Sequence, residues 1–187
     1  MKKVYKALHN QVFSQEDFAI VPIRYENRMS ILEWRNEQIY HLRQNKILTE
    51  DNQEKYFKNV VDLLFDQEKP NQILFSYLQN DICIGYGGLV HINWIDKNAE
   101  ISFIIKTKLE QSYFSEHWII FLKLIEQVAF QDIKLHKIST YAFDLRPHLY
   151  PVLEKAGFEK EATLKEHCFF DNNYIDVIIH RKLNQIK

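Results

Sequence analysis

The chain has 187 residues, 46% of them hydrophobic and 14% aromatic, and its 24 Lys and Arg nearly balance 25 Asp and Glu. This size predicts one globular domain, and the lack of a basic cluster argues against nucleic acid as the main partner. No apolar run approaches the roughly 20 residues that cross a bilayer, and the start lacks a signal-peptide pattern. We therefore expect a cytosolic protein with no membrane partner, in which Cys83 and Cys168 are unpaired thiols of little functional weight.

The first part of the chain predicts a strand followed by two helices. Pro22 suits the edge or the end of a strand. Apolar residues at helical spacing follow Ser30 and Thr49, and both side chains can cap a helix N-terminus. The expected elements are a strand over 18–24, a helix over 30–40 and a helix from Thr49 to before Pro70.

The middle of the chain is rich in β-forming residues. Two turn-forming stretches, Gln79–Asp81 and Asp96–Asn98, divide it. This pattern predicts an antiparallel meander of three strands. They cover residues 72–78, 82–92 and 99–105.

The last part alternates between helices and strands. A nearly uniformly apolar segment predicts a buried helix, and Pro147 with Gly157 marks the start and stop of a shorter one. A final hairpin is expected around 170–174. The elements are a helix over 115–130, a strand over 137–143, a helix over 147–156 and strands over 158–165 and 174–182.

Six short stretches in this order carry a resemblance to a known family. They are Leu32–Asn36, Ala99–Phe103, Val128–Phe130, Leu135–Ile138, Leu153–Glu161 and Tyr174–Ile178. The chain resembles the GNAT superfamily of acyl-CoA-dependent N-acetyltransferases. Within it, the chain is similar to the ribosomal-protein-alanine acetyltransferases and to the amino-sugar acetyltransferase of pseudaminic acid synthesis.

The resemblance implies an α+β fold and a cofactor. The fold is a GNAT-like mixed, mostly antiparallel seven-stranded sheet flanked by helices, with splayed fourth and fifth strands. We interpret residues 1–17 as an N-terminal extension and residues 18–187 as the single acetyltransferase domain. The implied acyl donor is acetyl-CoA, with the backbone of Phe103, Ile104 and Ile105 flanking its pantetheine arm and supplying an N–H to the oxyanion.

The turn that should hold the pyrophosphate departs from the family pattern. Relatives carry Gln/Arg-x-x-Gly-x-Gly/Ala there, whereas no glycine occurs here between Gly88 and Gly157. Main-chain N–H groups at a helix start bind phosphate whatever the side chain, so the turn can still bind CoA in a rearranged form. The candidate residues are Ser112, Tyr113, Phe114 and Ser115, with Asp144, Arg146 and His148 from the polar loop after the strand over 137–143.

The implied reaction is direct attack of an amine on the thioester, which needs a base and an acid. Glu100 is the first candidate base, because relatives keep a carboxylate there, and His91 is the second. Relatives use a tyrosine acid where this chain has Leu153, so Tyr150 is the substitute. Each side chain also has a structural reading: Glu100 bonded to a neighbouring strand, His91 packed or on the surface, and Tyr150 in the core.

The connection between the first two helices is expected to line the acceptor site. Its polar residues are Tyr40, His41, Arg43 and Gln44, and Arg43 can pair with a phosphate. The alternative is an ordinary solvated helix end. The eight histidines show no paired ligand spacing, so no metal is expected.

The sequence thus predicts an N-acetyltransferase acting on a small polar amine, first of all a nucleotide-linked amino sugar. One alternative is acetylation of a protein N-terminus. Another is a catalytically inactive GNAT-like module, favoured by the missing glycines and by Leu153. As a partner we expect only a small-molecule amine, with a monomer or a homodimer as the assembly.

Overall fold

The computed structural model describes residues 3–42, 44 and 46–185. Its strands are β1 (Phe13–Gln15), β2 (Phe18–Pro22), β3 (Ile73–Gln79), β4 (Ile82–Asn93), β5 (Asn98–Ile105), β6 (Lys137–Phe143), β7 (Glu159–Phe170) and β8 (Asn173–Leu183). Its helices are α1 (Arg28–Glu37), α2 (Glu50–Tyr56), α3 (Asp62–Leu64), α4 (Thr107–Ser112), α5 (Phe114–Glu126) and α6 (Leu149–Lys155). Short 3-10 turns cover Tyr25–Asn27 and Ile39–His41, and π-helical turns cover Phe57–Val61 and Gln127–Asp132.

One sheet organises the described residues, in the order β1-β2-β3-β4-β5-β6-β8-β7. Every neighbouring pair is antiparallel except β5 and β6, which run parallel. This confirms the mixed, mostly antiparallel α+β fold, with β5 and β6 as the fourth and fifth strands of the sequence prediction. The described sheet has eight strands and not seven, because Phe13–Gln15 forms an edge strand against β2.

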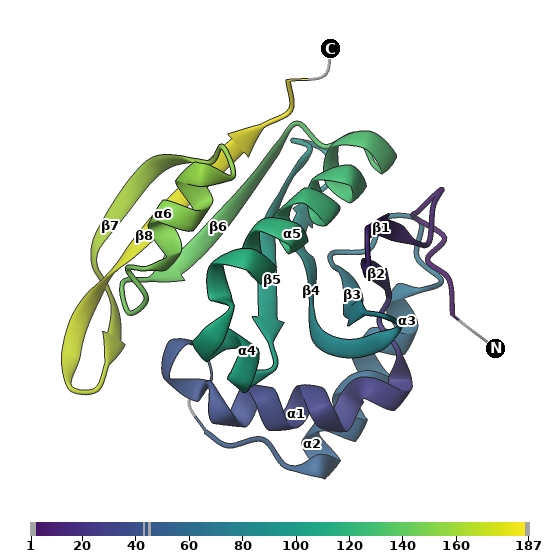
Figure 1. Cartoon of the computed structure of the whole chain (residues 1–187), viewed down its shortest axis with the longest axis horizontal. Coiled ribbons are helices and arrows are strands. Elements are labelled where there is room, and N and C mark those ends of the chain that lie inside the picture. The colour runs from purple at the N-terminus through teal and green to yellow at the C-terminus, as the bar shows by residue number, and fades with distance from the viewer. Residues whose placement is uncertain (1–2, 43, 45, 186–187) are drawn as a thin grey trace.

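The parallel pair β5 and β6 separates soon after it starts. Its register runs only from Asn98 opposite Lys137 to Glu100 opposite Ser139. Both strands continue beyond that point without pairing to each other, and they diverge in Figure 1. The predicted splay is therefore present, and it leaves an unpaired edge on each strand.

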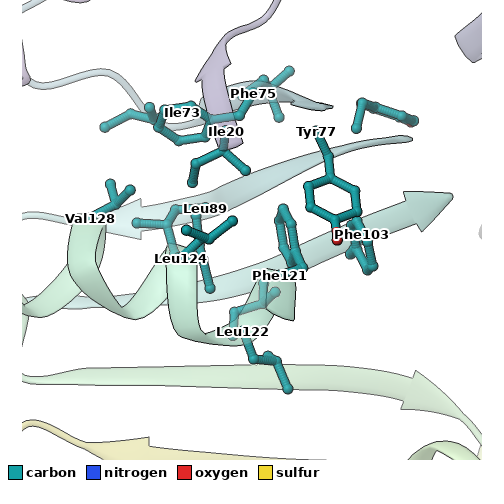
Figure 2. Packing of buried hydrophobic residues seen from close by; sticks show 14 of the residues in the cluster. Ile20, Ile73, Phe75, Tyr77, Leu89, Phe103, Phe121, Leu122, Leu124 and Val128 are labelled. Carbon is teal, nitrogen blue, oxygen red and sulfur yellow. The ribbon is translucent and has the colours of Figure 1, made fainter. Parts of the chain in front are cut away.

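The main core lies between the sheet and α5. Helix α5 is apolar on nearly every side, so it is buried against β3, β4 and β5 as its sequence predicts. Phe103 of β5 stacks on Phe121 of α5, with ring centroids 3.9 Å apart and an interplanar angle of 8°. Figure 2 shows these two rings beside Tyr77, with Leu89 and Leu124 continuing the layer. This packing fixes which face of β5 turns toward α5.

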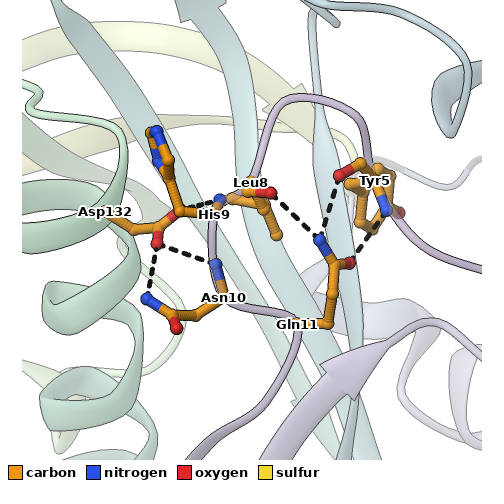
Figure 3. Close-up of polar contacts among 6 residues, drawn as sticks. All are labelled: Tyr5, Leu8, His9, Asn10, Gln11 and Asp132. Atoms are coloured by element: carbon orange, nitrogen blue, oxygen red, sulfur yellow. Dashed lines mark hydrogen bonds and ion pairs between the residues drawn. The ribbon is translucent and has the colours of Figure 1, made fainter.

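The segment before β1 is folded onto the sheet. Tyr5 is buried, and its hydroxyl donates to the carbonyl oxygen of Leu74 and accepts from the N–H of that residue. The buried carboxylate of Asp132, just after α5, accepts hydrogen bonds from the backbone N–H groups of His9 and Asn10 (Figure 3). These contacts tie the N-terminal residues to the end of α5.

Helices α1 and α2 lie across the end of the sheet where β5 finishes (Figure 1). The side chain of Gln38, which follows α1, is buried, and its Nε2 donates to the carbonyl oxygen of Ile105 at 2.7 Å. The same amide donates to the hydroxyl of Thr107 at 3.2 Å. The connection between α1 and α2 is therefore fastened to the C-terminal end of β5.

Candidate active site

A cavity of about 370 Å³ opens where β5 and β6 diverge. Residues from α1, β4, β5, β6, α5 and α6 line it, together with the loops before β3 and after β6. Side chains alternate between the two faces of a strand, so the cavity passes from one face of the sheet to the other. The predicted acceptor side has Glu100, Tyr141 and Phe143, and the opposite side has Trp118 and Leu149.

The backbone of β5 turns hydrogen-bonding groups toward this gap. The N–H of Lys106 donates to the carbonyl oxygen of Ile84 at 2.8 Å, in the register of the antiparallel β4–β5 pair. Because hydrogen-bonded pairs alternate along such a ladder, Ile104 pairs with β4, whereas Phe103 and Ile105 face β6. The N–H groups of Phe103 and Ile105 are thus turned toward the gap, as an oxyanion site and a pantetheine track require.

Both candidate bases line the acceptor side of the cavity. Glu100 lies on β5 beside the point where β6 separates, and His91 lies on the neighbouring β4. His91 has a left-handed backbone, with φ of 51°, at the irregularity between Val90 and Asn93. The structure therefore brings these two candidates to one wall.

The α1–α2 connection forms a second wall, and Arg35 of α1 contributes its charge there. The Arg35 Nη1 donates to the hydroxyl of Tyr86 at 2.6 Å, and its Nε donates to Gln44 Oε1 at 3.1 Å. Gln44, a predicted acceptor-binding residue, is thus bonded to Arg35 and is not part of the cavity lining, and its role stays a prediction. Tyr40 is 47% exposed, and Arg43 lies outside the described residues.

His41 lines the cavity with a nitrogen that has no partner. Its Nδ1 is buried without a hydrogen-bond partner, while Nε2 lies 3.3 Å from Gln38 Oε1. Burial, together with the positive charge of Arg146, lowers the pKa of this imidazole to about 3. At neutral pH, His41 is therefore an uncharged group available to a polar ligand.

Helix α4 forms where the sequence analysis expected the glycine-free turn. Ser112 lies in this helix, and the N–H of Tyr113 donates to the carbonyl oxygen of Leu109 at 2.8 Å. Phe114 and Ser115 instead form the first turn of α5, where N–H groups have no partner within the helix. Within the predicted stretch, the N–H groups without a helical partner therefore lie at Phe114 and Ser115 and not at Ser112, and Ser115 is exposed.

The polar loop after β6 packs against α4 and α5. Arg146 Nη1 lies 3.0 Å from Glu110 Oε1, with side chains only 11% and 8% exposed. Burial raises the pKa of the Glu110 carboxyl, and the attraction of Arg146 partly offsets this. His148 packs edge-on against Phe114, with ring centroids 4.5 Å apart. Arg146 and His148 thus border the start of α5.

The candidate acid Tyr150 lies outside the described lining of the cavity. Its hydroxyl donates to Asp144 Oδ1 at 2.8 Å, and its ring stacks on His180 with centroids 5.3 Å apart. Burial and the hydrogen bond to Asp144 raise the pKa of Tyr150, which makes its hydroxyl a weaker acid. Leu153, at the position where relatives carry the acid, is fully buried. The role of Tyr150 stays a prediction.

Sequence reasoning did not single out several residues that line or support the cavity. Arg35 lies within Leu32–Asn36, one of the stretches that carry the family resemblance, so a search for charged residues there could have found it. Gln38, Glu110 and Thr140 give no local signal, because their partners are distant in the chain. Among the described residues, no group of three His, Cys, Asp or Glu side chains is placed to hold a metal ion, and no helix is long and apolar enough to cross a membrane.

Comparison with known proteins decides the family. Residues 20–179 match the model of the acetyltransferase (GNAT) domain. The chain belongs to this family. It is therefore a GNAT-type, acetyl-CoA-dependent N-acetyltransferase, which confirms the predicted superfamily, activity and acyl donor. The branch within the superfamily stays a prediction.

Solved structures share this fold. A spermidine N-acetyltransferase from Vibrio cholerae in complex with CoA and spermine is similar with a TM-score of 0.77 and 20% identity, covering 91% of this chain and 97% of that one. A dodecameric structure of spermidine N-acetyltransferase from the same organism has a TM-score of 0.73 and 21% identity, covering 91% and 95%. The assembly and the location of the present chain stay predictions.

The residues present fit acetyl-CoA. The gap between β5 and β6 exposes backbone donors for an extended arm, and the first turn of α5 offers N–H groups to phosphate. Arg146 lies at the same end of the cavity. When bound, acetyl-CoA supplies the activated thioester.

Proposed function

We propose that the acceptor is a nucleotide-linked amino sugar, whose primary amine the enzyme acetylates. The observation that carries this proposal is the charge of Arg35 on the cavity wall. The other four arginines that the structure describes each lie within ion-pair distance of a carboxylate. Arg35 is held instead by the neutral groups of Tyr86 and Gln44.

A positive charge fixed by neutral partners favours an anionic group on the ligand. The planar guanidinium suits a phosphate in particular, because its N–H groups match two phosphate oxygens. The rings of Tyr141 and Phe143 line the same cavity, with centroids 6.3 Å apart. Flat apolar surfaces beside a fixed cation suit a base or sugar joined to a phosphate.

We propose a role in the transfer for each residue of the cavity wall that can move a proton or hold the acceptor. Glu100 is proposed to take the proton of the acceptor amine, with His91 as the second candidate. The N–H of Phe103 is proposed to stabilise the oxyanion that forms on the thioester carbonyl. Arg35 and the neutral His41 are proposed to hold the acceptor so that its amine points into the gap between β5 and β6.

The experiment compares acceptors at saturating acetyl-CoA. Thiol release is measured with a nucleoside-diphosphate-linked amino sugar, the corresponding free amino sugar, spermidine and a peptide with a free N-terminal alanine. We expect the nucleotide-linked sugar to give the highest kcat/KM. Spermidine carries only positive groups, which Arg35 disfavours.

Arg35→Gln tests whether the charge of Arg35 binds the phosphate of the acceptor. The variant should raise the KM for the nucleotide-linked sugar about tenfold or more, since a charged hydrogen bond contributes roughly 1.5–3 kcal/mol. The KM for the free amino sugar should change little. Arg181→Gln, which removes a surface ion pair with Glu159, is the matched control. Highest activity on spermidine or on the peptide would contradict the proposal.

A further inference from the structure

Two buried polar side chains lie on neighbouring strands beside the gap between β5 and β6, which the thioester must enter. Thr140 on β6 is 3% exposed and His180 on β8 is 1% exposed. Thr140 Oγ1 and His180 Nδ1 are both buried without a hydrogen-bond partner. Buried polar groups are nearly always satisfied by protein, water or ligand, so this pair needs an explanation.

The register of the sheet places the two residues directly opposite each other. Thr140 pairs with His180 across the antiparallel β6–β8 ladder, so both side chains leave the same face and their Cβ atoms lie about 5 Å apart. The stacking of Tyr150 on His180 shows that this is the face covered by α6. A water molecule bridging the two groups would satisfy both of them.

Thr140 also reaches the cavity itself. It lines the gap between β5 and β6 from the β6 side, with Ala142 and Leu149. On the β5 side, Ile101 and Phe103 line the gap, and the N–H of Phe103 faces it. A thioester placed for attack beside Phe103 would therefore have its sulfur near the β6 wall.

The acid used by relatives is missing at this place. Leu153 is fully buried and carries no proton donor, and the hydroxyl of Tyr150 donates to Asp144. Thr140, in contrast, lines the gap and carries a buried hydroxyl that has no hydrogen-bond partner.

We propose that the hydroxyl of Thr140 donates a hydrogen bond to the departing thiolate, and that His180 positions this hydroxyl through a bridging water. The acceptor nitrogen forms the C–N bond, the C–S bond breaks, and its electron pair goes to sulfur. The nitrogen gives its proton to the base, and the thiolate leaves hydrogen-bonded to Thr140 and takes a proton from solvent.

The donors and acceptors of His180, Thr140 and a bridging water explain how His180 positions the hydroxyl. Burial lowers the pKa of this imidazole, so the neutral ring has one nitrogen that accepts. A water that donates to His180 Nδ1 and to Thr140 Oγ1 leaves the threonine O–H directed at the gap. The inference rests on acetyl transfer from acetyl-CoA and does not depend on the identity of the acceptor.

The test measures the thiol pKa of bound CoA, by the ultraviolet absorbance of its thiolate across pH. Thr140→Val has nearly the same shape without the hydroxyl, and Thr140→Ser restores it. The thiol pKa should be about one to two units higher in Thr140→Val than in wild type, because a hydrogen bond to a charged group is lost. Thr140→Ser should return it close to the wild-type value. Both variants keep the other ionisable groups of the cavity lining, so the difference reports the hydroxyl. These groups are Arg35, His41, His91, Glu100, Tyr141 and Arg146.

His180→Phe keeps an aromatic ring against Tyr150 but removes the acceptor nitrogen. We expect an intermediate rise in the thiol pKa, which a purely structural role would not produce. An unchanged pKa in this variant would overturn the positioning role, and an unchanged pKa in Thr140→Val would overturn the catalytic one. Thr140→Ala serves as a second variant if valine disturbs the gap. Failure of wild type to bind CoA would overturn the cofactor site together with this inference, and it is recognised by titration calorimetry beforehand.

Discussion

Glu100 and His91 reach the cavity from neighbouring strands, and substitution separates their roles. Glu100→Gln keeps the size of the side chain and removes the base. Because general-base catalysis contributes about 100- to 10,000-fold, kcat should fall by at least the smaller factor. The affinity for acetyl-CoA should stay nearly unchanged. The measurement is the pH profile of kcat with the best acceptor of the panel.

His91→Gln is the matched control for this prediction. The exposed His91 should contribute little if Glu100 is the base. The assignment is reversed if Glu100→Gln keeps near-normal turnover while His91→Gln loses it together with the acidic limb of the profile.

Helix α4 depends on a buried ion pair with the loop after β6. Removing one partner of such a pair leaves the other charge uncompensated, which typically costs about 3–5 kcal/mol. Arg146→Met should therefore lower the free energy of unfolding by roughly 3 kcal/mol. The double variant Glu110→Gln with Arg146→Met should recover much of that loss, because no lone charge is left buried. Urea denaturation measures all of these.

The more exposed ion pair between Lys137 and Glu161 is the control for the buried pair between Glu110 and Arg146. Its side chains are 30% and 37% exposed, and surface pairs contribute about 0–1 kcal/mol. Lys137→Met should thus cost much less than Arg146→Met. Equal losses at the two sites would show that Glu110 and Arg146 do not act as a buried pair.

The elements with a strong hydrophobic period were predictable from the sequence. Helix α5 and the β3–β4–β5 meander follow from apolar patterning and from turn residues such as Asn80. Strand β1 was missed because three residues carry too short a pattern. Helix α4 was missed because a turn was expected there. That expectation came from the family resemblance alone and not from any local feature of the sequence.

The site was predictable only in part. Glu100 and His91 lie on strands whose pairing the sequence predicts, so their meeting could be foreseen. The pairing of Glu110 with Arg146 joins residues 36 apart, and Thr140 meets His180 only after β6 and β8 pair. Such contacts depend on tertiary structure, and residue spacing does not reveal them.

The molecule as a whole carries three buried or half-buried imidazoles with lowered pKa values, those of His41, His117 and His180, in each case mainly because of burial. In the unfolded chain each has a pKa near about 6.5. At a pH between the unfolded-state pKa and the lower folded-state pKa, the unfolded chain binds more protons than the folded protein. Stability should therefore be constant above about pH 6.5 and fall as the pH drops toward the folded pKa, which is about 3 for His41.

Urea unfolding between neutral and mildly acidic pH measures this loss. We expect a slope on the order of 1 kcal/mol per pH unit, flattened in His41→Gln. Glu110 acts in the opposite direction, since its pKa is raised in the folded state and it binds extra protons there. A free energy of unfolding that does not decrease on acidification would contradict the assignment of neutral buried imidazoles.

The central claim is that the glycine-free turn still binds acetyl-CoA, through the first turn of α5. The direct measurement is the thermal unfolding of the protein with and without acetyl-CoA, in wild type, Ser115→Ala and Ser115→Pro. Proline is tolerated in the first turn of a helix but has no N–H, so it removes one donor to the phosphate. At about 100 times its dissociation constant, acetyl-CoA should stabilise wild type by about 2.7 kcal/mol. At the same concentration it should stabilise Ser115→Ala nearly as much and Ser115→Pro much less. No stabilisation of wild type by either acetyl-CoA or CoA at millimolar concentration would contradict the account.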